Sequence, residues 1–198
     1  MKIKVIILDC HNLSLERLLN SKYISQLEKT FFDKYKDETT KIEKVVSAYL
    51  KNKYIGSYYL SESGKPLSND KYFNISHSGL LVTLIIDKYP IGVDIEKIRP
   101  VKEELIDYVT NVEEKKYVHD EETFFEIWTN KEALVKSLGI GIKQKPNNIP
   151  ALPINGLRQY EGKTYINKTV KYKDYIISTS RQSNEDYSLE IEEVNLDE

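Results

Sequence analysis

The sequence predicts an α+β domain, because helical and extended periodicities both occur along the chain. Apolar residues recur at helical spacing in residues 14–30, 37–53 and 124–139. Alternating or short apolar runs, typical of strands, lie at residues 2–9, 72–75, 80–86, 91–96, 172–180 and 187–194. A chain of 198 residues can bury a substantial core, as one large domain or as two small halves that share it.

The composition, with 40% hydrophobic and 30% charged residues, is ordinary for a soluble globular protein. The net charge of −2 argues against binding nucleic acid or a membrane surface through bulk charge. The single cysteine, Cys10, cannot form an internal disulfide, and we expect a small buried hydrophobe there. No apolar run approaches the ~18 residues of a membrane span, so we expect a cytoplasmic protein.

The first half of the chain is predicted to run strand, two helices, turn and strand. Leu15, Leu18 and Leu19 mark the first helix by their spacing. Gly64 and Pro66 then mark a turn, and the apolar run at 80–86 is typical of a buried strand.

IGVDIE, residues 91–96, opens the second half as a strand. Short helices are expected near 102–109 and 113–118, and FFEIWTNKEALVKSLG is the clearest helix, with Gly139 as its C-cap. We expect the strand at 91–96 and its predecessor to lie near the middle of the fold.

The alternation in IGVDIE places Gly92, Asp94 and Glu96 on the face opposite the isoleucines and valine. Same-face neighbours lie about 6.5–7 Å apart, so two carboxylates can reach one small cation, and Mg²⁺ favours carboxylate and phosphate oxygens. Gly92 is expected to leave room for a ligand at the backbone. An edge strand with a merely solvated polar face has the same pattern, so the acids alone leave both readings open.

WTNKEALVK, residues 128–136, carries Glu132 and Lys136 four residues apart at the border of an apolar helix face. They are either a surface ion pair worth about 0.3–0.5 kcal/mol or a third metal-binding acid and a phosphate-binding lysine. Lys131 projects into the apolar stripe, and we expect it to snorkel past Trp128 into water. The charged segment EEKKYVHDEE, residues 113–122, is expected to be solvated surface.

FNISHSG, residues 73–79, places His77 between two serines, which together offer several donors to an anion. His11 and His119 are expected to be structural. A possible phosphate-binding loop at Gly156 to Thr164 has five residues between its glycines where the motif needs four, and strand-like alternation follows it. We therefore exclude that segment as a nucleotide site.

Taken together, four stretches resemble the 4′-phosphopantetheinyl transferases of the longer, two-halved, surfactin-activating type. The stretches are Gly64-Lys65-Pro66, FNISHSG, IGVDIE and WTNKEALVKSLGIG, and they span residues 64–141. Their order and spacing agree with the family, whereas the segments before and after them match only in general character.

This resemblance implies transfer of the phosphopantetheinyl arm of coenzyme A to a serine of an apo acyl, peptidyl or aryl carrier protein, with release of 3′,5′-ADP. It implies two similar halves, residues 1–89 and 90–198, related by a pseudo-twofold axis with coenzyme A between them. It also implies a monomer that needs Mg²⁺. From the net charge, we expect no binding to nucleic acid or to membrane.

The resemblance further assigns roles at the reacting end. By analogy, Asp94, Glu96 and Glu132 hold Mg²⁺ against the pyrophosphate, and Lys136 is a cation that stabilises the charge on the leaving group. Glu132, directly or through a water, is the expected base for the carrier serine. Glu113 matches an acid that the family often has and is a supporting residue.

At the other end, Ser76 and His77 match phosphate contacts of the family, and Lys65 matches a lysine that lines the nucleotide end. The family often has an arginine at the start of the helix before Gly64-Lys65-Pro66, where it helps to bind the 3′-phosphate. Here the nearest candidates are Lys36 and Lys41, which can serve as point charges.

Two other functions fit parts of the pattern. Acids on a strand with a lysine also suit a Mg²⁺-dependent nuclease, although no basic patch with interleaved aromatics accompanies them. A non-catalytic module that binds coenzyme A or carrier proteins is the other alternative, and the complete acid trio argues against it.

Overall fold

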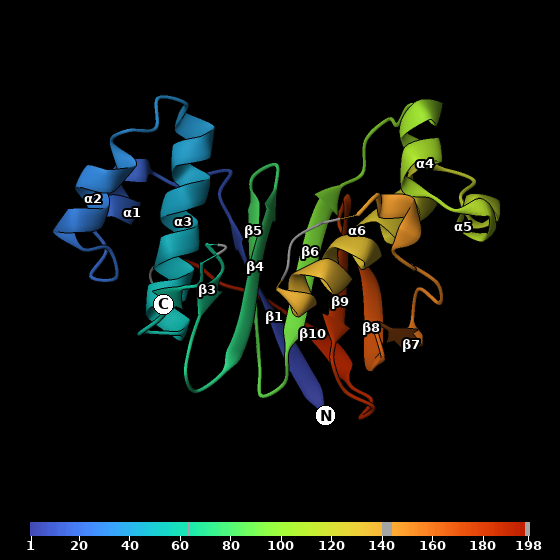
Figure 1. The fold of residues 1–198 in the computed structure, drawn as a ribbon. Helices are drawn as coiled ribbons and strands as arrows, with labels where there is room; N and C mark the ends of the chain where they lie inside the picture. The colour runs from blue at the N-terminus through green and yellow to red at the C-terminus, as the bar shows by residue number, and fades with distance from the viewer. Residues whose placement is uncertain (63, 140–143, 197–198) are drawn as a thin grey trace.

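The computed structural model describes residues 1–62, 64–139 and 144–196, and it confirms the α+β class. Two four-stranded sheets lie between two groups of helices (Figure 1). In chain order the elements are β1 (Lys2–Asp9), α1 (Leu15–Leu19), α2 (Gln26–Phe32), α3 (Glu38–Tyr54), β2 (Tyr59–Leu60), β3 (Pro66–Leu67), β4 (Tyr72–Ser78), β5 (Leu81–Asp87), β6 (Ile91–Lys97), α4 (Glu103–Val109), α5 (Val112–Tyr117), α6 (Glu121–Leu138), a 3₁₀ turn (Pro146–Asn148), β7 (Gly156–Tyr160), β8 (Lys163–Tyr172), β9 (Tyr175–Arg181) and β10 (Ser188–Glu193).

The two sheets differ in how their strands pair. The first has the order β10-β1-β5-β4, with β10 parallel to β1 and the other pairs antiparallel. The second has the order β6-β9-β8-β7 and is antiparallel throughout. The hairpin of β7 and β8 contains Gly162-Lys163-Thr164, which confirms that this segment is not a phosphate-binding loop.

The sheets are built in the same chain order. Each uses a strand, a long helix and an antiparallel strand pair: β1, α3, β4 and β5 in the first, and β6, α6, β8 and β9 in the second. In each sheet the opening strand pairs with the last of these strands, β1 with β5 and β6 with β9. β10 departs from this division, because it follows the second set in sequence and pairs in the first sheet.

The apolar faces of the two sheets pack on each other, which places the predicted core face of β6 in the centre of the molecule. This shared core comprises Ile3, Val5, Ile7, Leu81, Ile85, Ile91, Val93, Ile95, Ile166, Tyr175, Ile177 and Tyr187. Helix α3 packs against the first sheet and α6 against the second (Figure 1). The strand LVTLIID of β5 is apolar almost throughout because both faces of its sheet are covered.

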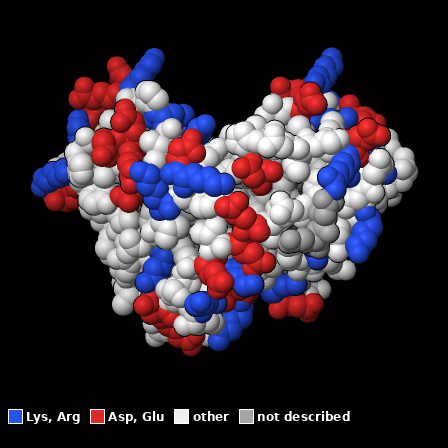
Figure 2. Space-filling model, turned by 180° about the vertical axis from the view of Figure 1, so that it is seen from behind, with Lys and Arg blue, Asp and Glu red and all other residues white. Residues whose placement is uncertain are grey.

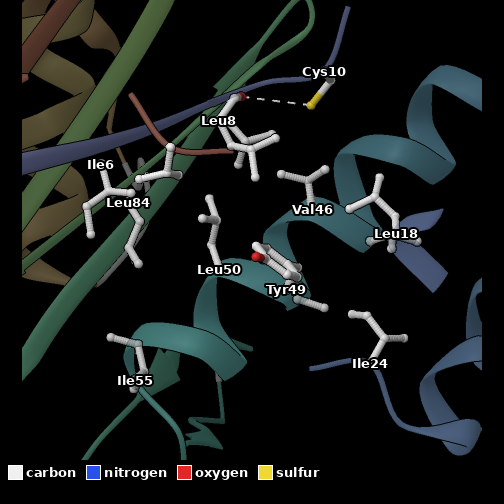
Figure 3. Close-up of a cluster of buried hydrophobic side chains, with 14 of the residues drawn as sticks. Ile6, Leu8, Cys10, Leu18, Ile24, Val46, Tyr49, Leu50, Ile55 and Leu84 are labelled. Carbon is white, nitrogen blue, oxygen red and sulfur yellow. Dashed lines mark hydrogen bonds between the residues drawn. The ribbon is translucent and has the colours of Figure 1, made fainter. Parts of the chain in front are cut away.

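The cluster beneath α3 contains Cys10 (Figure 3). Cys10 is 3% exposed and lies among residues that include Leu8 and Val46. Burial raises the pKa of its thiol to about 12, so the sulfur stays protonated at neutral pH. The prediction of a small buried hydrophobe is confirmed.

The predicted helices at 37–53 and 124–139 are confirmed as α3 and α6, and Gly139 ends α6 with a φ of 76°. The predicted helix at 14–30 is wrong, because two short helices, α1 and α2, replace it. Ser25 starts α2 with a capping box: its side chain accepts from the Glu28 amide, and the Glu28 carboxylate accepts from the Ser25 amide.

Strands β4 and β6 meet edge to edge where the two sheets come together. Every second side chain of β4 contacts β6: Asn74 Oδ1 accepts from the Val93 amide at 3.0 Å, and Ser78 Oγ accepts from the Lys97 amide at 3.1 Å. These bonds satisfy donors that a strand edge would otherwise leave unpaired. β6 is therefore an edge strand of its sheet, as one of the two interpretations of IGVDIE predicted. Its edge is not merely solvated, however, because side chains of β4 cover it.

Gly92 permits a close approach of helix α6 to strand β6. A Cβ atom at Gly92 would lie 2.0 Å from the Ala133 carbonyl oxygen and 2.5 Å from the Ser137 amide nitrogen. The expectation that Gly92 leaves room for a ligand is wrong, because helix backbone fills that space.

Lys131 is buried, so the expectation that it snorkels into water is also wrong. The residue is 1% exposed, and its Nζ donates to Glu114 Oε2 at 2.6 Å, to the Ile149 carbonyl at 2.7 Å and to the Pro146 carbonyl at 3.0 Å. Glu114 is also 1% exposed, in a segment that was expected to be solvated. This ion pair ties α6 to α5 and to the chain before β7.

The surface carries both signs of charge. Figure 2 shows acidic and basic side chains intermingled across the rear face, in keeping with the net charge of −2. Among the described residues, no helix is long and apolar enough to cross a membrane.

Candidate active site

Six of the seven predicted site residues line one cavity of about 350 Å³ at the junction of β4, β6 and α6. The lining consists of Ile75, Ser76, His77, Asp94, Glu96, Trp128, Glu132 and Lys136. The two-residue period of a strand aims Asp94 and Glu96 to the same side, and the four-residue spacing on α6 does the same for Glu132 and Lys136. The predicted residue outside this cavity is Lys65.

Asp94 is the most deeply buried acid of the cavity, at 5% exposed. Its Oδ1 accepts from Ser76 Oγ at 2.8 Å and from Lys136 Nζ at 2.6 Å. Its Oδ2 is buried and has no hydrogen-bond partner in the part of the chain that the structure describes. Burial raises the pKa of Asp94 above its ordinary value, although Lys136 and Ser76 act in the opposite direction.

Glu96 lies two residues further along β6 and nearer to the solvent. Its Oε2 accepts from Ser78 Oγ and from Arg99 Nη1, both at 2.9 Å. Ser78 thus supports Glu96 as Ser76 supports Asp94, so alternate serines of β4 hold alternate acids of β6.

Glu132 and Lys136 complete the cavity from α6. Burial, followed by the charges of Asp94 and Glu96, raises the pKa of Glu132 to about 7, and Lys136 opposes this shift. Lys136 Nζ also donates to Ser76 Oγ at 2.8 Å. Asp94 and Glu132 therefore share Lys136, whereas Glu96 is paired with Arg99.

His77 points away from the two serines of its strand, towards α3. Its Nδ1 lies 3.3 Å from Glu43 Oε2. Burial lowers the pKa of His77 below its ordinary value, and the charge of Glu43 works against that shift. Sequence neighbours Ser76 and His77 therefore contact opposite halves of the chain.

Lys65 lies beside the cavity and contacts α6 at its end. Its Nζ donates to the Lys136 carbonyl oxygen at 2.7 Å, which satisfies one of the free carbonyls of the last helical turn. Lys65 lines a second cavity of about 570 Å³, whose wall also includes Tyr59, Pro66, Tyr72 and Ser137.

The supporting residues lie further away. Lys41 Nζ pairs with Asp33 Oδ1 at 2.8 Å, and Lys36 is exposed. Glu113 is exposed and pairs with Lys116 at 2.6 Å. Ile140 and Gly141, the last residues of the WTNKEALVKSLGIG stretch, lie outside the described residues.

The carboxylates of Asp94, Glu96 and Glu132 are chemically suited to bind a divalent cation. Among the described residues, no three or more His, Cys, Asp or Glu side chains are already grouped to hold a metal ion. Even so, Asp94 presents an unpartnered buried oxygen and Glu132 a raised pKa, and both features favour an added cation. Carboxylate oxygens are the ligands that Mg²⁺ prefers.

Sequence reasoning missed four residues at the site. Ser78 and Arg99 hold Glu96, and the spacing of Ser78 from Ser76 on one strand could have indicated the first of these. Trp128 lines the cavity, whereas the sequence singled it out only as a neighbour of Lys131. Glu43 has no local signal, because only the tertiary packing of α3 brings it to His77.

Comparison with known families gives a match to the second half of the chain. The model of the 4′-phosphopantetheinyl transferase superfamily matches residues 90–191, which is more than half of the 198 residues. The chain belongs to this superfamily. The match includes β6 and α6, and so covers Asp94, Glu96, Glu132 and Lys136.

Curated members of the superfamily are similar over part of their length. 4′-phosphopantetheinyl transferase Sfp of Bacillus subtilis (strain 168) is 38% identical over 90 residues, 41% of this chain and 40% of Sfp. 4′-phosphopantetheinyl transferase gsp of Aneurinibacillus migulanus is 34% identical over 89 residues, 41% of this chain and 38% of gsp. AcpT of Salmonella typhi, also named a 4′-phosphopantetheinyl transferase, is 37% identical over 90 residues, 39% of this chain and 47% of AcpT. The chain thus spans less than half the length of these relatives.

Proposed function

We propose that the protein transfers the 4′-phosphopantetheine arm of coenzyme A to a serine of an apo carrier protein and releases 3′,5′-ADP. The arrangement of Ser76, Asp94 and Lys136 carries this proposal. A buried carboxylate is held through one oxygen by a hydroxyl and an ammonium group, and its other oxygen is left for a cation. The superfamily match and the names of the relatives support the same reaction.

Asp94, Glu96 and Glu132 would hold Mg²⁺ in this proposal. When bound, the ion would neutralise charge on the pyrophosphate and its leaving group. Lys136 adds a second positive charge at the same wall of the cavity, and Ser76 orients it. Stabilising charge as it develops on the leaving phosphate accounts for most of the catalysis expected from such a site.

Glu132 is the proposed base for the carrier serine. The serine oxygen forms a bond to the phosphorus that carries the pantetheine arm, and the bond from that phosphorus to the bridging oxygen breaks. The serine proton passes to Glu132, directly or through a water.

Ser76, His77 and Lys65 are proposed to contact the phosphates and the nucleotide end of coenzyme A. Ser76 and His77 line the cavity between β4, β6 and α6, and Lys65 lines the second cavity. The shared chain order of the sheets supports the proposed pseudo-twofold relation of halves 1–89 and 90–198, with coenzyme A between them. The proposal includes a cytoplasmic monomer that acts without nucleic acid or membrane.

Release of 3′,5′-ADP tests the reaction. The protein is incubated with coenzyme A, Mg²⁺ and apo carrier proteins of the acyl and peptidyl classes, and the nucleotide product is quantified by chromatography. We expect one 3′,5′-ADP per modified carrier. No 3′,5′-ADP with any carrier would contradict the proposal.

A further inference from the structure

Glu96 is held through one of its two carboxylate oxygens. Its Oε2 accepts from Ser78 Oγ and from Arg99 Nη1, both at 2.9 Å. A carboxylate oxygen has two lone pairs, so these two hydrogen bonds occupy Oε2 fully. Oε1 is therefore the oxygen that Glu96 can still offer to a cation.

Asp94, two residues earlier on β6, is held in the same way. Its Oδ1 accepts from Ser76 Oγ and from Lys136 Nζ, and its buried Oδ2 has no hydrogen-bond partner within the described residues. In both acids, a serine of β4 and a basic side chain together fill one oxygen. Each acid is therefore left with one oxygen for a metal ion.

The two donors to Glu96 are themselves held in place. Ser78 Oγ accepts from the Lys97 amide at 3.1 Å, and its proton goes to Glu96. Arg99 Nη1 also donates to the Lys97 carbonyl at 3.0 Å, and its guanidinium carbon lies 4.8 Å from the centre of the Phe125 ring. Neither donor can turn away from Oε2 without losing a second contact.

Divalent cations differ in how they use carboxylates. Mg²⁺ demands a compact octahedron of oxygens at about 2.0–2.1 Å, and it usually takes one or two carboxylates together with substrate phosphates and water. Ca²⁺ accepts about six to eight oxygens at about 2.3–2.6 Å, and both oxygens of one carboxylate can bind it. A carboxylate with one oxygen already filled therefore suits Mg²⁺ better than Ca²⁺.

On the basis of the metal site in the proposed function, we infer that Ser78 is a positioning residue that confines Glu96 to one ligating oxygen and thereby favours Mg²⁺ over Ca²⁺. Ser78 acts through Glu96, which lines the cavity. Ser78 lies on β4, before the residues 90–191 that the superfamily model matches. The first half of the chain thus sets a property of a metal site whose acids belong to the second half.

Competition for bound Mn²⁺ tests this inference without turnover. Mn²⁺ shares the octahedral oxygen coordination of Mg²⁺, and free Mn²⁺ is quantified by electron paramagnetic resonance as MgCl₂ or CaCl₂ is added. The proteins compared are the wild type, Ser78→Ala, Ser78→Thr, which keeps the hydroxyl, and the control Ser188→Ala. Ser188 is an exposed serine of β10, at the opposite edge of the sheet that contains β4. Mn²⁺ that Asp94→Asn also binds is subtracted as binding elsewhere.

The wild type, Ser78→Thr and Ser188→Ala are expected to release Mn²⁺ at a lower concentration of Mg²⁺ than of Ca²⁺. Ser78→Ala is expected to lose about tenfold in Mg²⁺ affinity, the lower end of the cost of removing a partner of a metal ligand, and little in Ca²⁺ affinity. Circular dichroism verifies that each variant is folded.

Two results overturn the role of Ser78 and leave the transferase proposal standing. One is a wild type that binds Ca²⁺ more tightly than Mg²⁺, and the other is a preference for Mg²⁺ that Ser78→Ala leaves unchanged. A wild type that binds no more Mn²⁺ than Asp94→Asn contradicts the metal assignment and this inference together. Release of 3′,5′-ADP tests the transfer reaction separately, so the two failures are distinguishable.

Discussion

Lys136 Nζ lies 2.6 Å from Asp94 Oδ1 and joins the last turn of α6 to the middle of β6. The two side chains are 28% and 7% exposed, so the contact is partly shielded from water. It uses one oxygen of Asp94, and the other has no partner among the described residues. This asymmetry leaves the carboxylate able to bind a cation without giving up its lysine.

Asp94→Asn is expected to abolish transfer while the fold is retained. Asparagine keeps an oxygen for Ser76 and Lys136 but offers no charge to a metal. Product formation should fall by at least about 10²-fold, the order of effect seen when charge stabilisation is lost. The control is Asp174→Asn, which removes an exposed carboxylate paired with Lys97. Near-normal transfer by Asp94→Asn, with its fold verified by circular dichroism, would contradict the metal assignment.

Glu132→Gln is expected to change how stability depends on pH. Because the pKa of Glu132 is raised from 4.5 to about 7, the folded protein binds this proton more tightly than the unfolded chain. That stabilisation is complete below pH 4.5 and is lost as the pH rises through 7. In EDTA, the variant should therefore exceed the wild type in unfolding free energy by about 1–2 kcal/mol at pH 8, and the gap should close towards pH 4.5.

Urea unfolding at several pH values measures this difference. Saturating Mg²⁺ at pH 8 should reverse its sign, because a ligand that binds the folded state stabilises the wild type more than a variant lacking one acid. Parallel pH profiles of the two proteins in EDTA would show that Glu132 has an ordinary pKa.

Gly92→Ala is expected to destabilise the protein by about 3 kcal/mol or more. The added methyl group would overlap the backbone of α6 at Ala133 and Ser137, and a helix backbone cannot yield as a side chain can. Gly162→Ala is the matched control, since a Cβ there meets no atom within 4 Å and the cost comes from a φ of 72° alone. That strain should amount to about 1 kcal/mol. Equal losses in the two variants, measured by urea unfolding, would contradict the close packing of α6 on β6.

Lys131→Met is expected to cost about 3–5 kcal/mol of unfolding free energy, because it leaves the buried carboxylate of Glu114 without its cation. Adding Glu114→Gln should restore part of the loss, since glutamine is neutral and still accepts from the Ala151 amide. Lys116→Met, which breaks the exposed pair with Glu113 on the same helix, should change stability little. A double variant no more stable than Lys131→Met would argue against an ion pair between Lys131 and Glu114.

Much of the fold follows from apolar faces, which leave a clear pattern in sequence. The alternation of β6 and the apolar stripe of α6 predicted both elements, because the apolar face of each packs in a core. The helix at 14–30 was mispredicted because the apolar spacing continues past residue 20, whereas the capping box at Ser25 and Glu28 starts a new helix. The return of β10 to pair with β1 has no local signal, since strand pairing across the whole chain depends on tertiary packing.

The candidate site was predictable where its residues share an element. Asp94 with Glu96, and Glu132 with Lys136, follow from the periods of a strand and a helix, and the cavity contains all four. The burial of Lys131 could not be predicted, because its partner Glu114 lies in a segment whose composition is that of exposed surface. The role of Gly92 could not be predicted, because a glycine permits the close approach of a ligand and of a packed helix equally well.

Intact-mass spectrometry of an apo carrier protein tests the central claim most directly. The carrier is incubated with the wild type, coenzyme A and Mg²⁺, beside samples with EDTA and with Asp94→Asn. We predict a mass gain of one phosphopantetheine group in the first sample and none in the other two. An unmodified carrier in all samples, across carriers of several classes and with coenzyme A binding retained, would contradict the account and indicate a binding module.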